Sequence, residues 1–187
     1  GPESKCDSLR KVFQNIRDLN PARLYFAARA LELGATVEDL YRSTGYDPWF
    51  LNEIKKIVTM EAELRTQKLA ALDDELVLRA KRLGTSDHRL ATLLGCTEEQ
   101  AAQRRRQSGI RPAFKVVDTC AAEFASSTPY LYSTYEHASD APPSRKKKII
   151  ILGGGPNRIG QGLEFDYCCV HAAFALKEAG YETIMIN

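Results

Sequence analysis

Helix signals dominate the pattern of apolar and polar residues from about residue 5 to residue 109, and helix-ending residues recur regularly between them. Asn20-Pro21 predicts a helix N-cap followed by proline at the first helical position, and Gly34 suits the left-handed residue that ends this helix. Thr36 is expected to cap the next helix, which Gly45 ends.

A longer helix is expected to open at Asp47-Pro48. Its apolar residues predict one buried stripe, comprising Trp49, Phe50, Ile54, Ile57, Val58 and Leu64. We interpret Trp49 and Phe50 as core anchors. A subunit contact is the alternative, because aromatic residues are enriched at interfaces.

The same signals continue in a helix from Asp73 to Gly84 and another from Ser86 to Gly95. Thr97 with Gln100 predicts a capping box for a further helix. Short helices joined by glycine turns are typical of a compact all-helical domain.

The pattern changes after residue 109. Residues 111–119 are expected to be extended, and residues 133–148 form a polar stretch with two adjacent prolines and a basic run, typical of a linker. The apolar run Ile149–Leu152 then predicts a strand buried on both faces of a parallel sheet. A helix over 165–178 and a strand over 183–186 would complete a Rossmann-like β-loop-α-β segment.

The predicted fold class is therefore mainly α, a compact multi-helix domain followed by an incomplete α/β segment. We place the helical domain at residues 1–139, the linker at 140–148 and the α/β segment at 149–187. Two parallel strands cannot bury both faces alone. The helical part or a second copy could cover them, but we expect that the segment belongs to a longer chain.

Charge and cysteine content narrow the function classes. The net charge is only +2, which gives no bias toward nucleic acid or a membrane surface. The five cysteines are odd in number and contain no CxxC, so neither a disulfide framework nor a zinc site is indicated, and a cytoplasmic protein is expected. No secretory signal is present, and Gly1-Pro2 is interpreted as a tag remnant.

A glycine-rich loop lies between the predicted strand and helix, with glycines at Gly153, Gly154, Gly155, Gly160 and Gly162. Such a loop lets backbone donors approach an anion at a helix N-terminus. Neither common fingerprint fits, because Arg158 replaces the third glycine of a dinucleotide loop and Gln161 replaces the lysine of a P-loop. A tight turn with no ligand of its own remains an equal alternative.

Two further groups of residues suggest chemistry. Cys168 and His171 share a helical face, but further metal ligands and a positioned base are missing, so we expect small buried residues packing on the sheet. The run Arg104-Arg105-Arg106 is compatible with a nucleic-acid site, yet Glu98 and Glu99 precede it. A solvated helix end is the preferred interpretation.

Several sequence runs resemble one family, the large subunits of bacterial-type carbamoyl-phosphate synthetases. The run ILGGGPNRIGQGLEFDYCCVHAAFALKEAGYETIMIN is similar to the start of the family's second synthetase half, its pre-ATP-grasp region. VDTCAAEF (117–124) and YSTYE (132–136) resemble the junction before it, and DPWFL (47–51) agrees with the family's oligomerisation domain.

The resemblance implies a fragment of an ATP-dependent ligase that serves arginine and pyrimidine biosynthesis. In that family one half makes carbamate from bicarbonate and glutamine-derived ammonia, and the other phosphorylates it to carbamoyl phosphate. The implied partners are a second copy, through the helical domain, and the glutamine amidotransferase small subunit, with no nucleic acid and no membrane. ATP and Mg or Mn would bind outside this fragment, which is expected to have no catalytic residue, cofactor or metal of its own.

The resemblance also implies that Arg158, Gly162 and Glu164 line the internal passage for carbamate. Gly162 leaves room where a side chain would narrow a channel, and Arg158 offers a planar donor array to a carboxylate-like intermediate. Glu164 is equally compatible with a helix N-terminal carboxylate favoured by the dipole. The competing hypotheses are a stand-alone nucleotide-binding regulator and a helical nucleic-acid-binding module.

Overall fold

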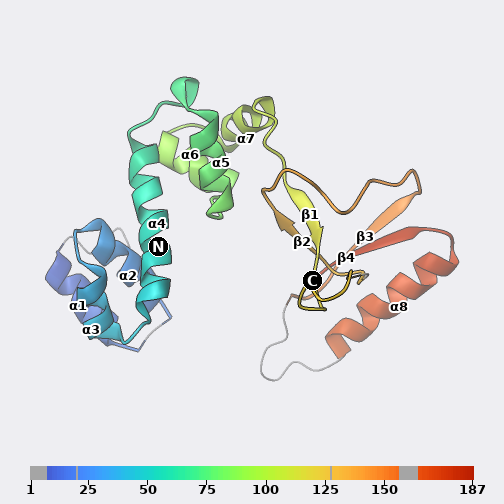
Figure 1. The fold of residues 1–187 in the computed structure, drawn as a ribbon, viewed down its shortest axis with the longest axis horizontal. Coiled ribbons are helices and arrows are strands. Elements are labelled where there is room, and N and C mark those ends of the chain that lie inside the picture. The colour runs from blue at the N-terminus through green and yellow to red at the C-terminus, as the bar shows by residue number, and fades with distance from the viewer. Residues whose placement is uncertain (1–7, 20, 127, 156–163) are drawn as a thin grey trace. The chain divides into compact units, whose positions relative to one another are not determined.

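Helices dominate the described part of the chain, which comprises residues 8–19, 21–126, 128–155 and 164–187 of the computed structural model. The chain divides into two units, Gly1–Asp140 and Ala141–Asn187. The helices of the first unit are α1 (Leu9–Arg17), α2 (Arg23–Glu32), α3 (Val37–Thr44), α4 (Pro48–Arg65), the 3-10 turn η2 (Leu69–Ala71), α5 (Asp74–Arg82), α6 (Asp87–Leu94) and α7 (Glu98–Gln107) (Figure 1). Its strands are β1 (Ala113–Val116) and β2 (Leu131–Thr134), and the second unit contains β3 (Lys148–Leu152), α8 (Glu164–Glu178) and β4 (Glu182–Ile186). The mainly helical fold class is confirmed.

The predicted helix boundaries are largely confirmed. Thr36 accepts a hydrogen bond from the Asp39 amide in a capping box, and Asp47 caps α4 with Pro48 at its first position. The start of α2 is an exception, because this helix begins at Arg23 with Ala22 as its N-cap. Asn20 lies outside the described residues.

The arrangement of α2, α3 and the start of α4 recurs 50 residues later in α5, α6 and α7. Glycines with positive φ occupy equivalent positions in the two copies: Gly34 corresponds to Gly84 (φ 92° and 87°), and Gly45 to Gly95 (φ 71° and 67°). The N-caps Thr36 and Asp47 likewise correspond to Ser86 and Thr97. After the first helix of each copy the chain turns through the same backbone hydrogen bond, from Ala35 N to Ala30 O (2.9 Å) and from Thr85 N to Ala80 O (3.0 Å). We call residues 23–57 the first repeat and residues 73–107 the second repeat.

The two repeats also bury equivalent positions. Each has its own hydrophobic core. The pairs of the two repeats in which both residues are buried and apolar are Phe26 and Leu76, Ala27 and Val77, Ala30 and Ala80, Leu40 and Leu90, and Leu51 and Ala101. The residue types differ at most of these positions, so that the fold repeats more faithfully than the sequence.

Helix α4 belongs to both cores. Leu51, in its first turn, is buried in the core of the first repeat, whereas Met60 and Leu64 are buried in the core of the second. Glu61 adds a polar connection, because its carboxylate accepts two hydrogen bonds from Arg89 of α6, at 2.7 and 2.5 Å. A single helix of 18 residues thus links the two repeats.

The predicted buried stripe of α4 is only partly correct. Leu64 is buried and Ile54 and Val58 are half-buried. Ile57, Trp49 and Phe50 are exposed, the two aromatic residues by 63% and 60%. The two rings contact each other edge to face, with centroids 5.0 Å apart. The interpretation of Trp49 and Phe50 as core anchors is therefore wrong, since the inward positions of the first turns are filled by Leu51 and Ile54.

Strands β1 and β2 form an antiparallel pair in which Ala113 faces Thr134 and Val116 faces Leu131. The extended chain around Phe114 agrees with the sequence, but β2 lies partly inside the stretch that was expected to be a linker. Tyr135, directly after β2, packs against the core of the second repeat. Its carbonyl accepts a hydrogen bond from Arg82 Nε at 3.2 Å.

In the second unit β3 and β4 pair in parallel, with Ile149 opposite Thr183 and Leu152 opposite Ile186. The parallel β-loop-α-β order is as predicted. The expected burial of β3 on both faces is not found, since Leu152 is 77% exposed and Ile150 is also exposed. Only α8 packs beside these strands in the described part of this unit. Within the described residues no helix is both long and apolar enough to cross a membrane.

Candidate functional site

The start of the glycine-rich loop is held by the residue that follows β4. The Gly153 amide donates to the Ile186 carbonyl at 2.7 Å, and a Cβ at Gly153 would lie 2.5 Å from Oδ1 of Asn187. Gly155, with φ of 80°, donates its amide to the same Oδ1 at 3.0 Å. The Asn187 amide group in turn donates to Asp166 of α8 at 3.3 Å. Glycine is therefore favoured at 153, because a Cβ there would have to displace the Asn187 side chain, and at 155 by its backbone conformation.

The residues expected to line a passage are mostly beyond what the structure describes. Arg158, Gly160 and Gly162 lie outside the described residues. Glu164 is the first residue of α8, and only its backbone is described. Gly154 is exposed, and a Cβ there would meet no atom within 4 Å. The roles of these residues remain predictions.

Helix α8 carries the cysteine and histidine that suggested chemistry. Cys168 and His171 are exposed, which contradicts the expected packing of these two residues on the sheet. The His171 ring contacts Tyr167 with centroids 4.1 Å apart and Phe174 at 6.2 Å. No group of three or more metal-ligating side chains occurs among the residues that the structure describes. His171 thus lies in an aromatic row along the helix.

All three arginines of the run 104–106 are engaged by carboxylates of the first unit. Arg104 Nη2 lies 2.6 Å from Asp74 of α5, and Arg106 Nη2 lies 2.5 Å from Glu99 within α7. Arg105 donates to both oxygens of Asp87 at 3.0 and 2.9 Å, with only 12% of its side chain exposed. The expected solvated helix end is wrong for Arg105. Guanidinium groups held in this way join α7 to α5 and α6, and phosphate binding would have to break these pairs.

Asp87 is the centre of a buried charge cluster. Besides Arg105, it accepts a hydrogen bond from Lys81 at 2.8 Å, and Lys81 also donates to the Thr85 carbonyl at 2.7 Å. Burial alone would raise the pKa of Asp87, but the hydrogen bonds from Arg105 and Lys81 outweigh it and lower the pKa below its usual range. The hydrogen bond from Arg105 to Asp87 raises the pKa of Arg105, against the effect of its burial. Asp87 and Arg105 therefore stay charged near neutral pH.

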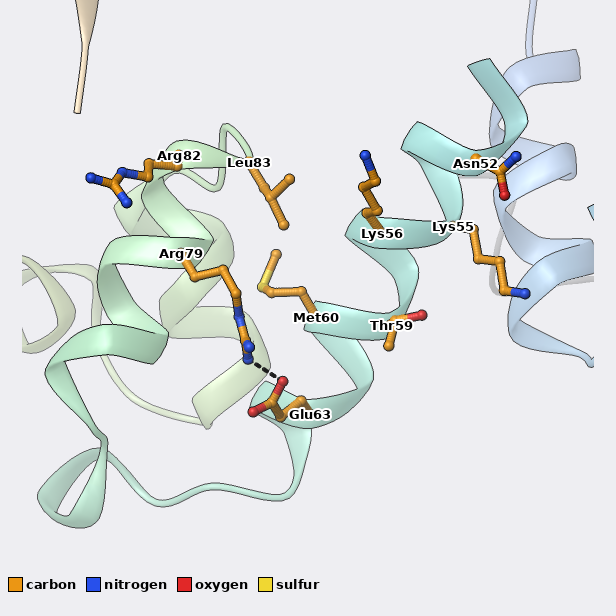
Figure 2. Close-up of a pocket in the computed structure, with 9 residues that line it drawn as sticks. All are labelled: Asn52, Lys55, Lys56, Thr59, Met60, Glu63, Arg79, Arg82 and Leu83. Atoms are coloured by element: carbon orange, nitrogen blue, oxygen red, sulfur yellow. Dashed lines mark hydrogen bonds and ion pairs between the residues drawn. The ribbon is translucent and has the colours of Figure 1, made fainter. Parts of the chain in front are cut away.

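A hollow of about 630 Å³ lies between α4 and α5 (Figure 2). Met60 and Leu83 point toward each other at its centre, and Arg79 is paired with Glu63 on its rim. Lys56 is paired with Glu53, and Arg82 donates to the Tyr135 carbonyl. An anion would have to compete with these partners at Lys56, Arg79 and Arg82, and Lys55 also lines the hollow. It has no nucleophile with an adjacent base among the residues that Figure 2 labels.

Comparison with known proteins shows the family to which this arrangement of helices belongs. The sequence profile described as carbamoyl-phosphate synthetase large chain, oligomerisation domain, matches residues 2–109. The chain belongs to the carbamoyl-phosphate synthetase large-chain family. A second profile, the carbamoyl phosphate synthase preATP-grasp domain, matches residues 145–187.

Relatives named carbamoyl phosphate synthase large chain support this assignment. The protein from Xanthomonas axonopodis pv. citri is 51% identical over 184 residues, which is 98% of this chain and 17% of that protein. The protein from Pseudomonas putida is 53% identical over 165 residues, 88% of this chain and 15% of that protein. The protein from Nostoc sp. is 47% identical over 183 residues, which is 98% of this chain and 17% of that protein. The chain thus spans less than a fifth of the length of these large chains.

The profile boundary at residue 109 coincides with the end of the repeats, because α7 ends at Gln107 and Gly109 has a φ of 69°. Sequence reasoning missed the 50-residue repeat and the charge cluster around Asp87. The paired Gly34 and Gly84 would have revealed the repeat. The cluster had no local signal, since Lys81 and Arg105 are separated by 24 positions along the chain and meet only through the packing of three helices.

Proposed function

We propose that the chain is the assembly and junction segment of a carbamoyl-phosphate synthetase large chain, the ATP-dependent ligase that makes carbamoyl phosphate from bicarbonate, ammonia and ATP. The two helical repeats bring large chains together, and the second unit begins the next synthetase half. The match of residues 2–109 to an oligomerisation domain carries this proposal. The arginines of α7 that pair with Asp74 of α5 and Asp87 of α6 support a scaffold role, because they join the helices of the second repeat.

The solution mass of the chain tests the assembly role. Light scattering over a wide concentration range should give a defined dimer or tetramer that persists in moderate salt, because apolar contacts are screened little by ions. A strict monomer at all concentrations would contradict self-association by this segment.

The passage residues belong to the same proposal. In a complete large chain, a carbamate passage beside Gly162 would be narrowed by any side chain there. A graded series of Gly162→Ala, Gly162→Leu and Gly162→Phe should progressively lower carbamoyl phosphate formation while bicarbonate-dependent ATP hydrolysis continues. Arg158→Lys keeps the charge but loses the planar donor array, and should lower product formation less than Arg158→Ala. Equal loss of both activities in the Gly162 series would argue for a folding defect and against a passage.

The remaining parts of the reaction are assigned to the rest of the large chain and its partner. In the rest of the large chain, ATP donates the phosphoryl groups with the help of Mg or Mn, and a glutamine amidotransferase small subunit supplies ammonia. Cys96, Cys120, Cys168 and Cys169 are free thiols, which fits a cytoplasmic protein. Sedimentation of a complete large chain with and without its small subunit should give the same repeat-mediated association, because the repeats are not proposed to contact that partner.

A further inference from the structure

The outer faces of the two repeats differ in chemistry although the backbone positions correspond. In the first repeat six apolar residues gather on α2 and α4, and we call them the α2–α4 strip: Leu24, Tyr25, Trp49, Phe50, Ile54 and Ile57. The residues 50 positions later are all polar or charged: Asp74, Glu75, Glu99, Gln100, Arg104 and Gln107. The second repeat therefore has polar or charged residues at all six positions where the first repeat has the apolar residues of the strip.

Hydrogen bonds and ion pairs fill the equivalent face of the second repeat. Asp74 accepts from Arg104 and from Ser108, each at 2.6 Å. Their counterparts in the first repeat are Leu24, Ile54 and the next residue of the same face, Val58. This face therefore carries an ion pair in the second repeat and apolar side chains in the first.

The strip is continuous. The lining of one hollow of about 360 Å³ includes Leu24, Phe50 and Ile54 beside Asp47. The lining of a second of about 390 Å³ includes Leu24, Tyr25, Ile54 and Ile57, with the charged residues Glu32, Glu61 and Arg89 at its edge. Leu24 and Ile54 border both hollows, and Trp49 extends the surface through its edge-to-face contact with Phe50. Leu24 is 53% exposed and Tyr25 60%.

We propose that the α2–α4 strip is the face through which one copy of this chain docks on the strip of a second copy. This inference rests on the proposed assembly function and specifies its contact surface. The six residues of the strip carry no formal charge, and Glu61 and Arg89 at its edge are paired with each other. Such a surface can pack on a second copy of itself, as a two-fold symmetric interface requires. Three aromatic side chains of this exposure supply on the order of 400 Å² per copy, about half of the roughly 800 Å² per partner in a standard interface. They form its apolar centre, in the residue types that dominate binding energy.

The chain contains its own reporter, because Trp49 is its single tryptophan and lies in the strip. The test measures mass by light scattering and Trp49 emission over the same concentration series. Docking should shift the emission to shorter wavelength in step with the rise in mass.

The disrupting variant carries the residues that the second repeat has at the same positions: Leu24→Asp, Tyr25→Glu and Phe50→Gln, leaving Trp49 in place. A second variant adds Trp49→Glu. Both should be monomeric at concentrations at least tenfold above those at which the wild type associates, with unchanged circular dichroism. The matched control, Tyr41→Glu with Phe124→Gln, replaces exposed aromatics of the same unit outside the strip and should associate like the wild type.

The outcomes separate the two proposals. If the wild type associates and the strip variants do so equally, the strip is not the contact and the inference is overturned, while the assembly function stands. If the wild type is a monomer throughout, both fail. A monomer whose Trp49 emission shifts only on mixing with the remaining segments of a large chain would overturn self-docking and assign the strip to a contact within one large chain.

Discussion

Lys81 and Asp87 form an ion pair of 2.8 Å in the second repeat, at the positions where the first repeat has Leu31 and Val37. The Lys81 side chain is only 5% exposed, and Leu31 is buried as well. The same fold thus tolerates either hydrocarbon or a charge pair at this place. The charge pair needs the additional guanidinium of Arg105, which stands where the first repeat has Lys55.

Asp87→Asn should destabilise the first unit by about 3 kcal/mol, because two poorly exposed cations lose their common counter-ion. Urea unfolding followed by circular dichroism measures this loss. Glu38→Gln is the control, since Glu38 and Arg42 form an exposed pair within α3 and should leave the midpoint unchanged. Equal midpoints for wild type and Asp87→Asn would show that the cluster does not contribute.

Replacing the whole cluster should reverse the loss. The triple variant Lys81→Leu, Asp87→Val and Arg105→Lys gives the second repeat the residues of the first. Apolar replacement of a buried ion cluster is often neutral or stabilising, so this variant should unfold within about 1 kcal/mol of the wild type or later. A triple variant less stable than Asp87→Asn alone would indicate that the two repeats pack differently at this site.

Stability should fall in acid partly through Asp87. Burial alone would raise its pKa, but hydrogen bonds from Arg105 and Lys81 lower the pKa below its ordinary value in the folded state. The unfolded state therefore takes up the proton at higher pH than the folded state. The contribution of Asp87 is fully present above the unfolded pKa and is lost as the pH falls through the folded pKa. The difference in unfolding free energy between wild type and Asp87→Asn should shrink from about pH 5 downward; a constant difference would contradict this assignment.

Gly45→Ala and Gly95→Ala should each cost about 1 kcal/mol, because both residues end a helix with positive φ. Gly45→Asn should cost less, since asparagine tolerates this conformation. Thermal unfolding of the three variants gives the comparison. Similar losses at 45 and 95 are expected from the equivalence of the repeats, and a loss at only one of them would limit that equivalence.

Gly153→Ala should displace Asn187, whose Oδ1 would lie 2.5 Å from the new methyl group. The Gly155 amide would then lose its acceptor and exchange faster with solvent. Hydrogen exchange at Gly155 measures the effect, and the matched control Gly154→Ala has no atom within 4 Å of its Cβ. Unchanged exchange in Gly153→Ala would show that Asn187 does not hold the loop.

Helix boundaries could be predicted from the sequence because caps are local. Thr36, Asp47 and Ser86 each accept a hydrogen bond from an amide two or three residues later, so the signal lies within one turn. The parallel order of β3 and β4 was also predictable, from an apolar run followed by a helix and a second strand.

The surface of α4 could not be predicted in the same way. Trp49, Phe50 and Leu51 are consecutive apolar residues, and periodicity alone does not say which of them faces the core. The fold places Leu51 inside and the two aromatics outside. Strand β2 was missed for a related reason, because Tyr132 pairs with Lys115 across a long connection that no local pattern encodes.

Because α4 contributes to both hydrophobic cores, the stabilities of the two repeats are coupled. Leu51 near the start of α4 packs in the core of the first repeat, and Leu64 near its end packs in the core of the second. Unfolding of either core therefore removes packing contacts from this helix. Stacked units coupled through a common element melt together, and stabilising one raises the free energy needed to open its neighbour. Binding of a second copy to the α2–α4 strip should therefore slow local unfolding around Val77 and Leu90 of the second repeat, although these residues lie outside the contact.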